Sequence, residues 1–272
     1  MAKKQNTKKK AILMISAGVA VLLMAQWAFI GWRFNFGPFK PLGRLRLAGL
    51  PGNADQYDFS HIKPAADSPL QGKTVLFLGS SVTNGEAALC QSIPEYFAAR
   101  LGCNSIREAV DGTTLTDNGK NSYVQRLLNH VDPLQKVDLL IYQLSTNDAS
   151  KEMPLGEISD GTVLEDFDTT TITGAMEYII AYAKDTWGCP VVFYTNARFD
   201  SEFYADMVAR LYELEEKWGI GVIDLWSDEE FNNITEAQRA LYMKDNIHPV
   251  KAGYRDWWGP ELERQLIEFI GR

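Results

Sequence analysis

The stretch Val75-Leu76-Phe77-Leu78-Gly79-Ser80-Ser81-Val82-Thr83-Asn84-Gly85 decides the fold of this 272-residue chain. It begins as a short, continuous apolar run and ends in a turn rich in glycine and serine. Such a run is typical of a strand buried on both faces of a parallel sheet. We therefore predict a strand over residues 74–79, with the Ser81 hydroxyl on the turn that follows it.

The chain downstream alternates between strand and helix patterns. Further strands are predicted over residues 105–110, 137–144, 190–195 and 221–225. Helices are predicted over residues 92–101, 122–130, 173–185, 202–217 and 254–270. Strands separated by helices pair in parallel through right-handed crossovers. We therefore predict an α/β domain over residues 71–272, with three α/β/α layers and a parallel five-stranded sheet.

Three polar positions follow the first three predicted strands. Ser81 comes after the first strand, Gly112 after the second and Asn147 after the third. Ligands of open α/β sheets bind at the carboxyl ends of the strands. The topology alone therefore brings these three positions to one edge of the sheet.

A serine nucleophile needs a base that takes its proton as it attacks. His61 lies in a connecting stretch and His130 ends a predicted helix, so ordinary surface or capping roles are expected for both. His248 precedes a proline and stands three residues after Asp245. In a turn, that spacing lets the carboxylate accept from Nδ1–H and leaves Nε2 free for the serine.

The tetrahedral intermediate of acyl transfer needs hydrogen-bond donors for its oxyanion. The candidates are the N–H groups of Ser81 and Gly112 and the side-chain amide of Asn147. A turn role for Gly112 and a capping role for Asn147 are the structural alternatives. Three further residues are expected to contact the substrate: Thr83, Thr113 and Arg198. For Arg198, an ion pair with Asp200 or Glu202 is an equally weighted alternative.

Four segments together resemble the SGNH/GDSL hydrolase family: residues 79–82, Gly112, residues 145–148 and residues 245–249. The last, Asp-Asn-Ile-His-Pro, keeps the family pattern, whereas Ser80 replaces a frequent aspartate and Ser145 a glycine. The resemblance implies a flavodoxin-like domain in which Ser81, His248 and Asp245 are catalytic. It implies no metal or organic cofactor, and the three cysteines have no metal-site spacing.

The N-terminus is expected to lie outside the fold. Residues 1–10 form a basic tail with five lysines, and residues 11–32 are an uncharged run about as long as the ~20 residues of a membrane-spanning helix. We predict a cytoplasmic tail and a single-pass signal anchor, rather than a cleaved signal peptide, with the catalytic domain extracytoplasmic. Residues 33–70 contain five prolines, which argue against regular structure in this juxtamembrane segment.

The charge distribution excludes a class of partners. Residues 1–65 hold ten of the 27 basic residues and two of the 35 acidic ones, so the remainder carries a formal charge of −16. A domain this acidic is repelled by nucleic acid.

We expect an ester hydrolase that removes short acyl groups, such as acetyl, from surface carbohydrate. The family resemblance leaves a lipase, lysophospholipase or thioesterase as alternatives on the same site. A glycan O-acyltransferase and an inactive glycan-binding module also remain open, as does the oligomeric state.

Overall fold

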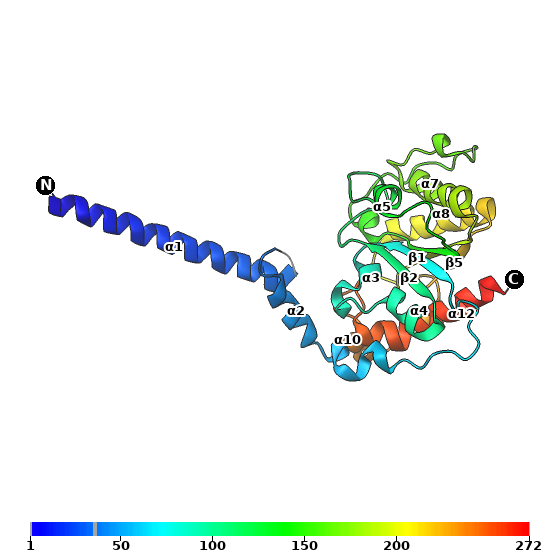
Figure 1. The fold of residues 1–272 in the computed structure, drawn as a ribbon, viewed down its shortest axis with the longest axis horizontal. Coiled ribbons are helices and arrows are strands. Elements are labelled where there is room, and N and C mark those ends of the chain that lie inside the picture. The colour runs from blue at the N-terminus through cyan, green and yellow to red at the C-terminus, as the bar shows by residue number, and fades with distance from the viewer. Residues whose placement is uncertain (1, 35–36, 272) are drawn as a thin grey trace. The chain divides into compact units, whose positions relative to one another are not determined.

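The structure is a computed structural model that describes residues 2–34 and 37–271. The chain forms two compact units, Met1–Leu50 and Pro51–Arg272. Figure 1 shows the elements of each unit along the chain.

The first unit is helical. Helix α1 runs over Ala2–Phe34 and α2 over Lys40–Ala48. The segment Ile12–Arg33 has a mean hydropathy of 2.1, and by length and composition it is long and apolar enough to cross a membrane. Arg46 joins the two helices, because its Nε donates to the Trp32 carbonyl at 2.9 Å and its guanidinium lies over the Trp32 ring.

Helix α2 corrects the expectation that residues 33–70 lack regular structure. Its proline, Pro41, stands in the first turn. A helix tolerates proline there because the first N–H groups have no acceptor within the helix. Proline content therefore predicted an irregular segment where the structure has a short helix.

The second unit alternates strands and helices, as predicted. Its strands are β1 (Thr74–Gly79), β2 (Asn104–Ala109), β3 (Leu139–Gln143), β4 (Val191–Tyr194) and β5 (Gly221–Ile223). Its longer helices are α4 (Ile93–Leu101), α5 (Tyr123–His130), α7 (Ile172–Trp187), α8 (Glu202–Trp218) and α12 (Gly259–Ile270). Short α-helices are α3 (Ser81–Asn84), α6 (Thr146–Ser150), α9 (Glu229–Asn232), α10 (Glu236–Tyr242) and α11 (Lys251–Gly253). The remaining turns are 3₁₀ at Pro51–Asn53, Asp55–Tyr57, Phe59–His61, Glu86–Ala88 and Leu164–Asp166, and a π-turn at Tyr254–Trp258.

The five strands form one parallel sheet in the order β2-β1-β3-β4-β5. This is the flavodoxin-like order. The chain moves outward from β1 to β2 and then returns to place β3 on the other side of β1, so the strand order reverses between β1 and β3. Ligands bind at such a reversal point. Ser81 follows β1 and Asn147 follows β3, so both flank it.

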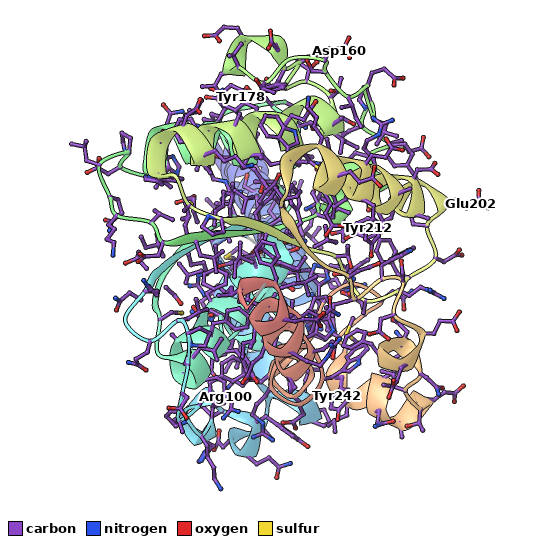
Figure 2. The ribbon with its side chains drawn as sticks, turned by 90° about the vertical axis from the view of Figure 1, so that its right-hand side faces the viewer. Arg100, Asp160, Tyr178, Glu202, Tyr212 and Tyr242 are labelled. Carbon is purple, nitrogen blue, oxygen red and sulfur yellow. The ribbon has the colours of Figure 1, made fainter. Side chains whose placement is uncertain are left out.

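Strand β1 divides the core into two layers. Leu76 and Leu78 point into the cluster covered by α5, α7 and α8, whereas Val75 and Phe77 point into the cluster covered by α4 and α12. This is the two-residue alternation of a strand. Figure 1 shows these helix sets on opposite sides of the sheet, and in Figure 2 Tyr178 of α7 and Arg100 of α4 lie on opposite sides as well. The predicted three-layer α/β/α class is confirmed.

Residues 51–70, which the sequence assigned to the juxtamembrane segment, pack within the second unit. Phe59 and Leu70 are buried in the cluster beside α4 and α12, and Asn53 is 3% exposed. The compact unit therefore begins at Pro51. The sequence pattern also missed α9 and α10, which lie in the long connection after β5.

Candidate active site

Ser81 stands where β1 ends and a short helix begins. Ser80 is the N-cap of α3 and Ser81 is its first residue. The N–H of a first helical residue has no acceptor within its own helix, so it is available for another group. Ser81 is 7% exposed, so only a small part of it is accessible to solvent at this edge of the sheet.

A buried glutamine supports this turn from below. Gln143, the last residue of β3, is fully buried, and its Oε1 accepts from Ser80 N–H and from Thr83 Oγ1, each at 3.0 Å. Thr83 Oγ1 also lies 2.6 Å from the Tyr194 hydroxyl. Thr83 is fully buried, so it has no surface for the substrate contact expected from the sequence. Its hydroxyl is directed inward, where it links three strand ends.

The structure brings Ser81, His248 and Asp245 together. Ser81 Oγ lies 2.8 Å from His248 Nε2. On the other side of the ring, His248 Nδ1 lies 2.9 and 3.0 Å from the two carboxylate oxygens of Asp245. The other two histidines do not join this group: His61 is exposed, and His130 Nδ1 contacts Glu108 at 3.3 Å.

Asp245 organises its own turn. Its Oδ1 accepts from the N–H groups of Ile247 and His248, each at 2.9 Å. Burial raises the pKa of this carboxyl, but the hydrogen bonds and charge of His248 and the two N–H groups lower it more, so the net pKa is well below its usual range. Asp245 is therefore ionised throughout the neutral range, as a partner of an imidazole must be.

The turn that carries His248 lies outside the sheet and is held by backbone contacts. Lys244 N–H donates to the His248 carbonyl at 2.9 Å, and Met243 and Pro249 form an isolated antiparallel bridge. The Tyr254 hydroxyl then donates to the Val82 carbonyl at 2.6 Å, which ties the chain after the histidine to the residue after the serine.

The segments that carry the oxyanion candidates contact one another. Gly112 adopts φ +75°, a conformation that favours glycine, and an added Cβ would meet open space. Asn84 at the end of α3 donates to Asp111 at 2.7 Å, and Asn147 Nδ2 donates to the Thr113 carbonyl at 2.9 Å. An amide nitrogen carries two N–H groups, so Asn147 keeps one after this bond. The hydrogen bonds of Asn84 and Asn147 therefore join the neighbours of Gly112 to the segments that follow β1 and β3.

Asp148 fixes the loop after Gly112. This carboxylate is fully buried, and its oxygens accept from Leu115 N–H at 2.7 Å and Thr116 N–H at 3.0 Å. Burial raises its pKa, while those hydrogen bonds oppose the rise. Asp148 thus fixes residues 115 and 116, and its neighbour Asn147 binds the Thr113 carbonyl in the same loop.

Arg126 performs a similar task on the other side of this loop. Its guanidinium is fully buried and donates to the carbonyls of Glu108 and Gly79, each at 2.7 Å, and to Asn121 at 2.9 Å. It therefore joins the carboxyl ends of β1 and β2 from α5. The signal in the sequence is an arginine on the same helix face as Tyr123 and Leu127.

Two of the predicted substrate contacts have other partners. Arg198 donates through Nε to the Trp226 carbonyl at 3.0 Å, and in the described part of the chain it pairs with neither Asp200 nor Glu202. It lines a cavity of about 640 Å³ that does not include Ser81. Thr113 remains half-buried beside Gly112, with its hydroxyl on the Val110 carbonyl at 2.7 Å. The hydrogen bonds that the side chains of Arg198 and Thr113 donate are thus made to backbone carbonyls and not to Ser81.

The comparison with protein families now identifies the class. The model of the GDSL-like lipase/acylhydrolase family matches residues 77–255, well over half of the chain. The chain therefore belongs to the GDSL-like lipase/acylhydrolase family, which confirms the resemblance read from the four sequence segments. A comparison with curated proteins finds no match.

Solved structures share the fold at low identity. A protein from Lactobacillus plantarum is 21% identical with a TM-score of 0.59, covering 74% of this chain and 97% of that one. A protein from Bacteroides ovatus described as a GDSL-like lipase is 17% identical with a TM-score of 0.53, covering 74% and 98%. A family two carbohydrate esterase from Clostridium thermocellum, solved with cellohexaose, is 14% identical with a TM-score of 0.54, covering 76% and 67%.

Replacing Asp148 tests its anchoring role. In Asp148→Asn, one carboxylate oxygen is replaced by an NH₂ group, which cannot accept a hydrogen bond. One of the two buried backbone N–H groups, of Leu115 or Thr116, therefore loses its partner. We expect the free energy of unfolding in urea to fall by about 1–3 kcal/mol. Asp160, exposed at the periphery in Figure 2, is the matched control, and Asp160→Asn should change stability by less than about 0.5 kcal/mol. Equal stability of the two variants would contradict the role.

Proposed function

We propose that this protein is a serine ester hydrolase in which Ser81 is the nucleophile, His248 the general base and Asp245 the residue that orients the base. The observation that carries the proposal is the 2.8 Å separation of Ser81 Oγ and His248 Nε2, with Asp245 on the opposite ring nitrogen. These distances fall within the range required of a nucleophile, its base and the base's partner. Membership of the family supports the same reaction class.

The reaction begins when Ser81 Oγ attacks the ester carbonyl carbon. His248 Nε2 takes the hydroxyl proton as the new C–O bond forms, and the Asp245 carboxylate stabilises the resulting imidazolium. The tetrahedral intermediate collapses by breaking the bond to the alcohol, which leaves with the proton from His248. Water then attacks the acyl carbon while His248 Nε2 takes a proton from it. The second tetrahedral intermediate breaks its bond to Ser81 Oγ, which recovers that proton from His248 as the acid is released.

The negative oxygen of the intermediate is held by the N–H groups of Ser81 and Gly112 and by the Asn147 side-chain amide. The orphan position of the Ser81 N–H in α3 and the second N–H of Asn147 support this assignment. No group of three or more His, Cys, Asp or Glu that could hold a metal occurs among the described residues. The proposed steps are assigned to side chains and backbone of the chain itself.

The proposed substrate is a short acyl ester of a carbohydrate. A cavity in the segments that follow β4 and β5 is lined by polar and charged residues: Arg198, Glu229, Glu230, Asn232, Asn233 and Arg239. We propose that a sugar unit of the substrate binds there. Such groups suit sugar hydroxyls better than an alkyl chain. The fold shared with a carbohydrate esterase agrees with this choice.

The proposed location is the extracytoplasmic side of a membrane, with α1 as the anchor. The apolar segment Ile12–Arg33 follows five lysines within the first ten residues. Positive charge is retained on the cytoplasmic side of a spanning helix, so the N-terminus is placed inside.

Two variants test the chemistry. Ser81→Ala should abolish hydrolysis of p-nitrophenyl acetate, because it removes the nucleophile and only one buried oxygen. Asn147→Ala should reduce kcat by about 10²–10³, the loss that follows removal of one oxyanion donor. Circular dichroism checks that both variants are folded. Wild-type turnover in Ser81→Ala would exclude the proposed mechanism, and full kcat in Asn147→Ala would give that residue a structural role.

The acyl preference follows from the polar lining. p-Nitrophenyl acetate should be cleaved with a higher kcat/KM than p-nitrophenyl decanoate, because the residues that line the cavity are charged or carry amides and give a long alkyl chain few apolar contacts. Faster cleavage of the decanoyl ester would indicate a lipase instead. Transfer of the acetyl group to an added oligosaccharide, measured by mass spectrometry, would indicate an acyltransferase.

The anchor predicts a defined topology. In an expression host, the full chain should stay with membranes after alkaline extraction. Protease added to intact spheroplasts should digest the unit Pro51–Arg272 and spare an N-terminal tag. Release of a shortened chain into the medium would instead show that the apolar segment is a cleaved signal peptide.

A further inference from the structure

Asn53 is a buried side chain that contacts two backbone segments at once. It ends the 3₁₀ turn Pro51–Asn53 and is 3% exposed. Its Nδ2 donates to the Ala87 carbonyl at 2.8 Å, and its Oδ1 accepts from Lys251 N–H at 3.0 Å. A buried amide with both ends engaged fixes the separation of the groups it joins.

The two groups belong to the two halves of the proposed active site. Ala87 lies six residues after Ser81, in the turn Glu86–Ala88. Lys251 lies three residues after His248 and is the first residue of α11. Asn53 therefore joins the segment of the nucleophile to the segment of the base, although it is distant from both in sequence.

The residues after Asn53 repeat this double contact. The Asp58 carboxylate accepts from Lys251 Nζ at 2.9 Å on the base side and from Gln91 Nε2 at 2.6 Å on the nucleophile side. Phe59 N–H also donates to Gln91 Oε1 at 2.9 Å. Residues 53–59, which we call the N-terminal strap, thus lie across both segments.

We propose that Asn53 is a positioning residue for the active site and that the N-terminal strap sets the approach of His248 to Ser81. This inference rests on the proposed function. His248 lies on a turn outside the sheet, whereas Ser81 is fixed to the end of β1. The base therefore depends on contacts such as those of Asn53 and Tyr254 for its place relative to the serine.

The first test compares two asparagine variants in the full-length protein. Asn53→Ala removes both hydrogen bonds, and kcat for p-nitrophenyl acetate should fall about 10-fold or more with KM nearly unchanged, because displacement of a catalytic group by about 1 Å can cost up to ~10²-fold. The control is Asn104→Ala, since Asn104 is exposed and its side-chain amide donates to the Gly72 carbonyl at 3.2 Å, away from both segments of the proposed site. It should keep wild-type kcat. A wild-type kcat in folded Asn53→Ala would overturn the proposal.

A second pair of variants tests the hydrogen bond from Lys251 N–H to Asn53 Oδ1 alone. It tests the role of Asn53 even if Asn53→Ala does not fold. Lys251→Pro removes the N–H that Asn53 accepts, and proline is tolerated at the first position of a helix. Lys251→Ala removes the same side chain and its contact with Asp58 but keeps the N–H. We expect kcat of Lys251→Pro to be several-fold below that of Lys251→Ala. Equal kcat values would overturn the role of Asn53.

Labelling with a fluorophosphonate separates this inference from the proposed function. The probe reacts with an activated serine, so wild-type protein should be labelled at Ser81 and Ser81→Ala should not. Asn53→Ala should be labelled at a rate reduced in parallel with its kcat. No labelling of the wild type would overturn the hydrolase itself. Labelling of Asn53→Ala at the wild-type rate would overturn only the positioning role.

Discussion

The contact between Ser81 Oγ and His248 Nε2 joins residues that are 167 positions apart in the chain. A hydrogen bond weakens steeply as its distance and angle depart from the optimum, so both segments must be held within a fraction of an ångström. The serine takes its place from β1, an interior strand of the parallel sheet. The histidine takes its place from side-chain and backbone bonds that reach outward from Asp245, Tyr254 and Asn53. One half of the pair is placed by the sheet and the other by individual hydrogen bonds to its turn and to the segment that follows.

The sheet edge that carries the serine is stabilised by polar groups inside the protein. Gln143, Arg126 and Asp148 are all fully buried, and each binds backbone groups of the loops that bear the candidate site. Burial of such groups costs free energy unless hydrogen bonds replace those to water. Where the bonds are made, the network restricts the backbone to one arrangement. The rigidity of this edge therefore depends on polar contacts as much as on apolar packing.

The sequence predicted those features that depend on neighbouring residues. The apolar run at 74–79 and the Asp245–His248 spacing each act within a few residues, and each has its expected form. The direction of a single side chain depends on what packs around it. The sequence predicts a substrate contact for Thr83, but its hydroxyl binds Gln143 and Tyr194, which lie 60 and 111 positions away, inside the protein. The sequence gives no signal for Asn53 for the same reason, because its partners, Ala87 and Lys251, lie 34 and 198 positions away.

The connection between the two units is very short. Helix α2 ends at Ala48 and the compact unit begins at Pro51, so only Gly49 and Leu50 lie between them. Consecutive Cα atoms are 3.8 Å apart, so this link spans at most about 11 Å, roughly the diameter of one helix. Two residues are too few to act as a flexible polypeptide tether, so Gly49 and Leu50 add almost no reach of their own to the chain.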